Sequence, residues 1–207
     1  MLTAVKALPE SWMQGFVATL AELLTATQAS DAAGRVCAID EAVEWAALAA
    51  RATHERGNKL IFIGNGGSAG IASHMAADYS KSANLRALAM NDASMLTCLG
   101  NDCGYEQVFA KQIEFHGRAG DFLVALSSSG RSANILNAVE VARGMDCTVM
   151  TLSGFTPNNP LRSTGDMNFF LASDSYLFVE VGHMALCHAI LEYSIERCGD
   201  GAVGPRP

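Results

Sequence analysis

The chain opens with two segments whose apolar residues recur at helical spacing. Residues 9–28 place Phe16 and Leu20 on one face, and residues 39–56 do the same with Ala42, Trp45 and Ala49. A glycine directly follows the second segment, as is typical of a helix end. The pattern therefore predicts two helices before any strand.

From residue 60 onward, short apolar runs alternate with helical segments. The run at residues 60–63 is continuous and precedes a glycine-rich turn, which is typical of a buried parallel strand. Further strands are predicted at residues 87–90, 122–126, 148–152 and 168–171, and helices at residues 68–82, 105–115, 132–144 and 176–197. This alternation predicts an α/β fold, a three-layer sandwich with a five-stranded, mostly parallel sheet flanked by helices and preceded by two N-terminal helices.

The length of 207 residues fits one domain. We expect residues 1–56 to form the N-terminal helices and residues 57–198 the α/β core. Residues 199–207 are rich in glycine and proline and are predicted to form a loose tail.

Composition restricts the possible partners. Half of the residues are hydrophobic and the net charge is −7, which argues against a nucleic-acid partner, because phosphate backbones select a basic surface. No apolar run reaches the roughly 20 residues that a membrane span needs, and the N-terminus lacks a secretory pattern. The six cysteines form no CxxC pair, so we expect free thiols and a cytoplasmic location.

A glycine-rich loop at residues 64–70 lies between a predicted strand and a predicted helix. Its glycines let the backbone approach a ligand, and the helix start offers free N–H groups to an anion. Two other interpretations stay open. Gly64, Gly66 and Ala69 also satisfy the loose dinucleotide fingerprint, with Asp92 as a ribose-binding acid, and the loop could be only a tight turn.

A second loop, residues 127–132, follows another predicted strand. It carries Ser127, Ser128, Ser129 and Ser132 at the start of a helix. Four hydroxyls together with helix N–H groups suit a phosphate, which needs many short donors. Ordinary N-capping by one serine is the alternative interpretation.

Three motifs, taken in order, resemble the phosphoheptose isomerase branch of the SIS family. They are Gly64-Asn65-Gly66-Gly67-Ser68, Leu99-Gly100-Asn101-Asp102 and Ser127-Ser128-Ser129-Gly130 with Ser132-Ala133-Asn134. The resemblance extends from about residue 40 to residue 195. It implies the SIS fold, a sugar-phosphate substrate, no nucleotide cofactor and a homotetramer with active sites between subunits. The implied reaction converts sedoheptulose 7-phosphate into D-glycero-D-manno-heptose 7-phosphate.

The resemblance also implies which residues bind the substrate. The serines of the second loop would hold the phosphate, and Asn65, Gly66, Gly67 and Ser68 would line the sugar site. Glu180 on the last helix would bind the substrate as well. Asn101 and Asp102 would contact sugar hydroxyls, although an Asx turn before Gly104 is an equally simple interpretation of that pair.

The reaction needs a base beside the reacting carbon and an acid near the oxygen. His74 and Asp78 are four residues apart and share a helix face, while Glu180 and His188 lie on the last helix. The resemblance implies catalysis by Asp78 and His188. It also shows two departures, because the family has glutamate at position 78 and glutamine at position 180. An exposed ion pair of Asp78 with Lys81 is the alternative for that carboxylate.

In some members of the family the same four positions bind zinc. His74, Asp78, Glu180 and His188 are therefore predicted zinc ligands, since two histidines and two carboxylates suit a tetrahedral site. His183 is expected to be a packed or interface histidine.

Four functions remain compatible with the sequence. They are the phosphoheptose isomerase, an isomerase of another sugar phosphate, a non-catalytic SIS protein that acts as a sensor or as an adaptor for a replication initiator, and a nucleotide-dependent oxidoreductase, which rests on the first loop alone and against which the serine-rich loop argues. Arg131 and the irregular segment 155–165 have no assigned role.

Overall fold

A computed structural model of the chain describes residues 11–198. Its elements are, in order, α1 (Trp12–Thr25), β1 (Gln28–Asp31), β2 (Val36–Cys37), α2 (Ile39–Glu55), β3 (Leu60–Gly64), α3 (Gly67–Ala83), β4 (Ala87–Ala89), α4 (Ala93–Asp102), η1 (Tyr105–Gln107), α5 (Val108–His116), β5 (Phe122–Ser127), α6 (Ala133–Gly144), β6 (Thr148–Gly154), η2 (Pro160–Ser163), β7 (Met167–Leu171) and α7 (Tyr176–Cys198). The predicted tail, residues 199–207, lies outside the described residues.

The sheet has the strand order β2-β1-β7-β6-β5-β3-β4. The five strands from β7 to β4 run parallel to one another, which confirms the predicted parallel sheet. The remaining two, β1 and β2, pair antiparallel at the β7 edge and bring the sheet to seven strands. They were not predicted, because β1 is a short polar segment in which only Ala29 is buried.

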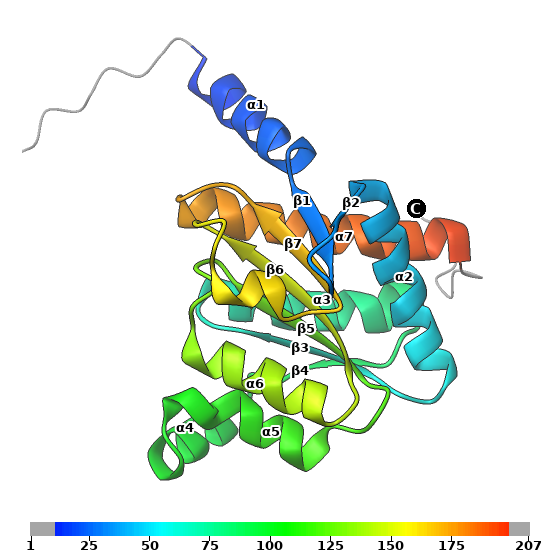
Figure 1. Cartoon of the computed structure of the whole chain (residues 1–207), viewed down its shortest axis with the longest axis vertical. Coiled ribbons are helices and arrows are strands. Elements are labelled where there is room, and N and C mark those ends of the chain that lie inside the picture. The colour runs from blue at the N-terminus through cyan, green and yellow to red at the C-terminus, as the bar shows by residue number, and fades with distance from the viewer. Residues whose placement is uncertain (1–10, 199–207) are drawn as a thin grey trace, which may run out of the picture.

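Helices cover both faces of the sheet (Figure 1). Buried residues of α2, α3 and α7 form one core with Leu60, Phe62 and other residues on one side of the strands. Buried residues of α4, α5 and α6 form a second core with Ile61 and Ile63, which alternate with the first set along β3. The three-layer sandwich predicted from the sequence is therefore confirmed.

Helix α4 was not predicted. Its first turn is capped by Asp92, whose carboxylate accepts a hydrogen bond of 2.9 Å from the Met95 backbone N–H. The carboxylate that the dinucleotide interpretation would assign to a ribose is thus part of a helix cap.

Helix α1 extends away from the sandwich (Figure 1). It has no buried residue, and its main ring contact is the stacking of Phe16 on Phe178 of α7 at 5.0 Å between ring centroids. Trp12, Met13 and Val17 are exposed on this helix. Within residues 11–198, no helix is both long and apolar enough to cross a membrane.

Among the described side chains, five cysteines are free, as predicted. They are Cys37, Cys98, Cys103, Cys147 and Cys187.

His183 on α7 is completely buried and packed, as expected. Its Nε2 donates a hydrogen bond to the Ser153 carbonyl oxygen at 3.2 Å, and its Nδ1 has no partner within the described chain. Burial lowers the pKa of His183 from 6.5 to about 4, against the smaller opposing effect of the Ser153 hydrogen bond. The folded protein therefore holds this ring in its neutral form at neutral pH.

This depressed pKa predicts a loss of stability in mild acid. The unfolded chain takes up a proton near pH 6.5 and the folded chain only near pH 4, so the free energy of unfolding falls as the pH drops through this interval. Between pH 7 and pH 5 we expect a loss of about 2 kcal/mol from this group. Urea unfolding of wild type and His183→Gln at the two pH values measures it. The exposed His116→Gln variant is the control, and an equal pH dependence in wild type and His183→Gln would contradict the prediction.

Candidate active site

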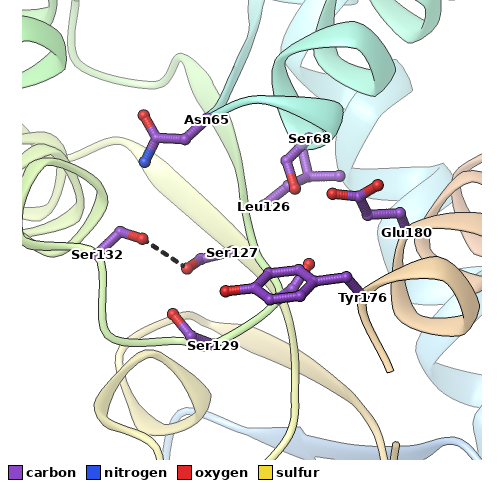
Figure 2. A pocket seen from close by; sticks show the side chains of 9 residues that line it. Asn65, Ser68, Leu126, Ser127, Ser129, Ser132, Tyr176 and Glu180 are labelled. Atoms are coloured by element: carbon purple, nitrogen blue, oxygen red, sulfur yellow. Dashed lines mark hydrogen bonds between the residues drawn. The ribbon is translucent and has the colours of Figure 1, made fainter. Parts of the chain in front are cut away.

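A small cavity lies at the carboxyl ends of β3 and β5, where parallel sheets bind their ligands. Its volume is about 130 Å³, below the roughly 300–1,000 Å³ of sites that enclose a whole small molecule. It is lined by Asn65, Ser68, Leu126, Ser127, Ser128, Ser129, Ser132, Tyr176 and Glu180 (Figure 2). The size and the hydroxyl lining suit an anchoring pocket for one small polar group.

The serine loop, residues 127–132, supplies four hydroxyls to this pocket. Ser127 donates to the Ser132 hydroxyl at 3.2 Å, and the Ser129 hydroxyl accepts from the Arg131 backbone N–H, also at 3.2 Å. Ser132 is the N-cap of α6 but makes no side-chain cap hydrogen bond. The capping interpretation of the loop therefore does not apply to Ser132, and the first N–H groups of α6 stay available to a ligand.

The glycine loop, residues 64–70, is tied to the serine loop by a pair of amides. Asn65 and Asn134 exchange two hydrogen bonds of 2.9 Å, and Asn134 is buried at the start of α6. The Tyr105 hydroxyl donates to Asn65 Oδ1 at 3.1 Å. The bonds between Asn65 and Asn134 therefore fix the distance between the glycine loop and the start of α6, which follows the serine loop.

Glu180 of α7 lies over the start of α3. A methyl group at Gly67 would come within 2.3 Å of Glu180 Oε2, so the carboxylate occupies the space beside this glycine and would have to move if a larger residue stood there. Ser68 is buried beside it, while the N-cap of α3 is Gly66, which has no side chain that could accept a hydrogen bond from the first N–H groups of the helix. The carboxylate therefore sits where the positive end of the α3 dipole favours a negative charge.

Tyr176, at the start of α7, lines the pocket but was not predicted as a site residue. Figure 2 shows its ring extending from α7 toward the serine hydroxyls. Its position is set by an edge-on contact with Phe155 at 4.7 Å between ring centroids. The only sequence signal was its place just after β7, whose carboxyl end lies at the same edge of the sheet.

A second group of polar residues, the histidine cluster (His74, Asp78 and His188), lies further along α3 and α7. The Asp78 Oδ2 atom is 3.1 Å from His74 Nε2 and 4.0 Å from His188 Nε2. The two imidazole rings meet edge-on with centroids 5.3 Å apart. Asp78 thus pairs with His74 rather than with Lys81.

The structure gathers three of the four predicted metal ligands. One ligand atom from each member of the histidine cluster lies within 4.8 Å of the other two, and Glu180 is not part of the group. Glu180 lies eight residues before His188 on α7, which is a rise of about 12 Å at 1.5 Å per residue. Its carboxylate belongs to the pocket instead.

Asn101 and Asp102 do not line the pocket. Both are exposed in the last turn of α4, where Asn101 Nδ2 donates to Asp102 Oδ1 at 2.7 Å. They form the end of a helix rather than an Asx turn, and the side-chain hydrogen bonds that they make within the described chain are to each other and to Cys98.

Comparisons with known proteins agree with this arrangement. A family model of the SIS domain matches residues 18–154. The chain is 40% identical over 146 residues to a phosphoheptose isomerase of Akkermansia muciniphila, which covers 68% of this chain and 77% of that protein. The structure of a phosphoheptose isomerase from Neisseria gonorrhoeae is similar, with a TM-score of 0.69 and 30% identity, covering 87% of this chain and 97% of that one. One from Francisella tularensis has a TM-score of 0.74 and 27% identity, covering 89% and 94%.

The parallel sheet, the serine pocket at its carboxyl edge and these similarities over most of both chains lead to one assignment: the chain belongs to the phosphoheptose isomerases of the SIS-domain family.

Proposed function

We propose that the protein interconverts sedoheptulose 7-phosphate and D-glycero-D-manno-heptose 7-phosphate. The observation that carries the proposal is the serine pocket, which offers hydroxyls and two helix N-termini to a phosphate in a chain of this family. Asn65 and Ser68 line the same pocket and contact the sugar next to the phosphate. The free cysteines among the described side chains suit a reducing cytoplasm, and residues 1–207 are taken as one SIS domain.

The serine loop binds the phosphate because it is rich in donors. Its hydroxyls can each turn a hydrogen toward an anion, and the start of α6 adds backbone N–H groups and a partial positive charge. Ser127 and Ser128 are buried and already bonded or packed, so they are ordered before substrate arrives. Little conformational freedom is then lost on binding.

Asp78 is the base that moves the proton between the first two carbons of the open-chain sugar. Removing that proton leaves an enediolate, and returning it to the neighbouring carbon completes the isomerisation. His74, 3.1 Å from Asp78, orients the carboxylate. His188, whose Nε2 lies 4.0 Å from Asp78 Oδ2, donates a proton to the carbonyl oxygen and takes one from the hydroxyl on the neighbouring carbon, which becomes the new carbonyl. It also assists ring opening.

The histidine cluster also fits a zinc ion. Bonds of about 2.0–2.1 Å in a tetrahedron require ligand atoms roughly 3.5 Å apart, which small rotations of these side chains provide. His74, Asp78 and His188 would hold the ion, and a bound zinc would then polarise the substrate carbonyl as a Lewis acid in place of proton donation by His188. The proton transfers described for Asp78 and His188 apply to the protein without the ion. Three protein ligands leave the fourth position open, as in catalytic sites.

We further propose that the protein is a homotetramer whose subunits share active sites. Asp78 follows Ser68 by ten residues on α3, a rise of about 15 Å. The pocket and the histidine cluster of one chain are therefore well separated. The exposed apolar residues of α1, Trp12, Met13 and Val17, are suited to contact another subunit.

A non-catalytic sugar-phosphate sensor is the second candidate. The observation that favours it is Asp78, which is shorter than the glutamate that the resemblance places there and which already pairs with His74. A carboxylate withdrawn by about 1 Å can cost 10²-fold in rate.

The first prediction from the proposed function is loss of turnover without loss of binding. Asp78→Asn and His188→Ala should each lower kcat for sedoheptulose 7-phosphate by at least about 10²-fold, because each removes a proton-transfer group. Affinity for the substrate, measured by calorimetry, should change little, since neither residue lines the pocket. His116→Ala, an exposed histidine on α5, is the control. Binding without turnover in the wild type would favour the sensor.

The second prediction concerns zinc. Wild-type protein dialysed against zinc should retain about one ion per chain, and His74→Ala or His188→Ala should lose it. Glu180→Gln should retain it, because Glu180 lies outside the cluster. Metal content measured by mass spectrometry decides the matter independently of activity. Equal retention in all variants would refute the proposed ligands.

The third prediction tests shared sites. Ser127→Ala/Ser129→Ala lacks part of the pocket and Asp78→Asn lacks the base, so each protein alone should be inactive. Coexpressed chains that mix in one tetramer should recover about a quarter of wild-type activity, because that share of sites pairs an intact pocket with an intact cluster. Mixed tetramers confirmed by native mass spectrometry, yet inactive, would place the whole site within one chain.

A further inference from the structure

The 155–165 segment, irregular and without a predicted role, packs against the back of the serine loop. The Leu161 backbone N–H donates to the Gly130 carbonyl oxygen at 3.1 Å, and the Gly154 N–H, just before the segment, donates to the Ser128 carbonyl oxygen at 3.0 Å. Arg131 extends to the Thr156 hydroxyl at 3.5 Å. The backbone of the serine loop is therefore held by hydrogen bonds to this segment and to the end of β6.

Asn159 organises this segment. Only 3% of its surface is exposed. Its Nδ2 lies within hydrogen-bond distance of Ser153 Oγ (3.2 Å) and of the carbonyl oxygens of Gly154 (3.2 Å) and Thr156 (2.9 Å). Its Oδ1 accepts from the Arg162 N–H at 3.1 Å and so caps η2. One side chain thus connects the end of β6, the segment and η2.

The serine loop lies directly on this side chain. A methyl group at Gly130 would fall 1.9 Å from Asn159 Oδ1, and the φ of Gly130 is +62°, where residues other than glycine are strained. No space is left between Gly130 and the amide. A displacement of Asn159 is therefore transmitted to the loop at its turn, between Ser129 and Ser132.

We propose that Asn159 is a positioning residue for the phosphate pocket. It lies outside the pocket lining and acts through Gly130, by fixing the turn that aims the serine hydroxyls. The inference rests on the proposed role of the serine loop in binding phosphate. Several short donors can bind one anion together only when their backbone is held to a fraction of an ångström.

A second buried asparagine provides a matched control. Asn168 on β7 is 1% exposed and, like Asn159, makes four hydrogen bonds within the described chain, to Thr151, Gly165 (twice) and Ser30. None of these partners belongs to the serine loop. Replacing either asparagine by alanine should therefore lower the thermal midpoint of unfolding to a similar extent. Only the replacement of Asn159 should weaken phosphate binding in the pocket.

The experiment compares Asn159→Ala with Asn168→Ala in the full chain. We expect Asn159→Ala to weaken binding of inorganic phosphate and of sedoheptulose 7-phosphate, measured by calorimetry, by about tenfold. The KM should rise by a similar factor with kcat changed much less, because the histidine cluster is not touched. Asn168→Ala should leave both affinities and KM at wild-type values. Equal affinities in wild type and Asn159→Ala, or equal losses in both variants, would overturn the proposal.

Gly130→Ala tests whether Asn159 acts on the pocket through Gly130. It also replaces Asn159→Ala in the comparison if that variant does not fold. It should weaken phosphate binding by at least as much, and the double variant should be about as weak as the weaker single variant, because both act on one contact. Fully additive losses would overturn the route through Gly130. Phosphate binding without turnover in the wild type would refute the isomerase but still leave this comparison decisive, whereas a wild type that binds neither ligand refutes both.

Discussion

The parallel pairing of β3 with β5 is the constraint on which the candidate site depends. Gly64 lies opposite Leu126 in this register, so the glycine loop and the serine loop leave the sheet at the same edge and side by side. The helices that follow, α3 and α6, then direct their N-termini toward one small volume. A shift of this register would separate the two loops, and the exchange of hydrogen bonds between Asn65 and Asn134 across them depends on it.

Much of this arrangement was predictable from the sequence, because its signals are local. A continuous apolar run such as β3 followed by glycines indicates a buried strand and a ligand loop. The pairing of β1 with β7 was not predictable, since it is set by the partner strand and not by the composition of residues 28–31. The role of Asn159 was hidden for a similar reason, because its effect depends on Gly130, which is 29 positions away in the sequence.

The predicted set of metal ligands illustrates the limit of helical spacing. Glu180 and His188 are on one helix, and their spacing alone is compatible with both side chains binding one metal ion. The packing of α7 along α3 assigns them to different groups, because Glu180 meets Gly67 at the start of α3 while His188 meets His74 about two turns further on. Glu180, which stands where the resemblance places a glutamine, therefore lies at a helix N-terminus, where a negatively charged carboxylate is favoured. Its negative charge would oppose that of the phosphate that we propose binds in the same pocket, and the dipoles of α3 and α6 would offset the repulsion.

The two groups differ in their access to water, and this difference bears on the chemistry. Ser68, Ser127 and Ser128 are buried, whereas the side chains of His74, Asp78 and His188 are 49%, 28% and 40% exposed in the single chain. A carboxylate that water can hydrogen-bond is a weak base, and an enediolate open to water is easily lost to side reactions. Isomerisation at the histidine cluster, as proposed, needs a further surface over these side chains when substrate is bound. Among residues 11–198 of one chain they stay partly exposed, and in the proposed tetramer a neighbouring subunit would provide that surface.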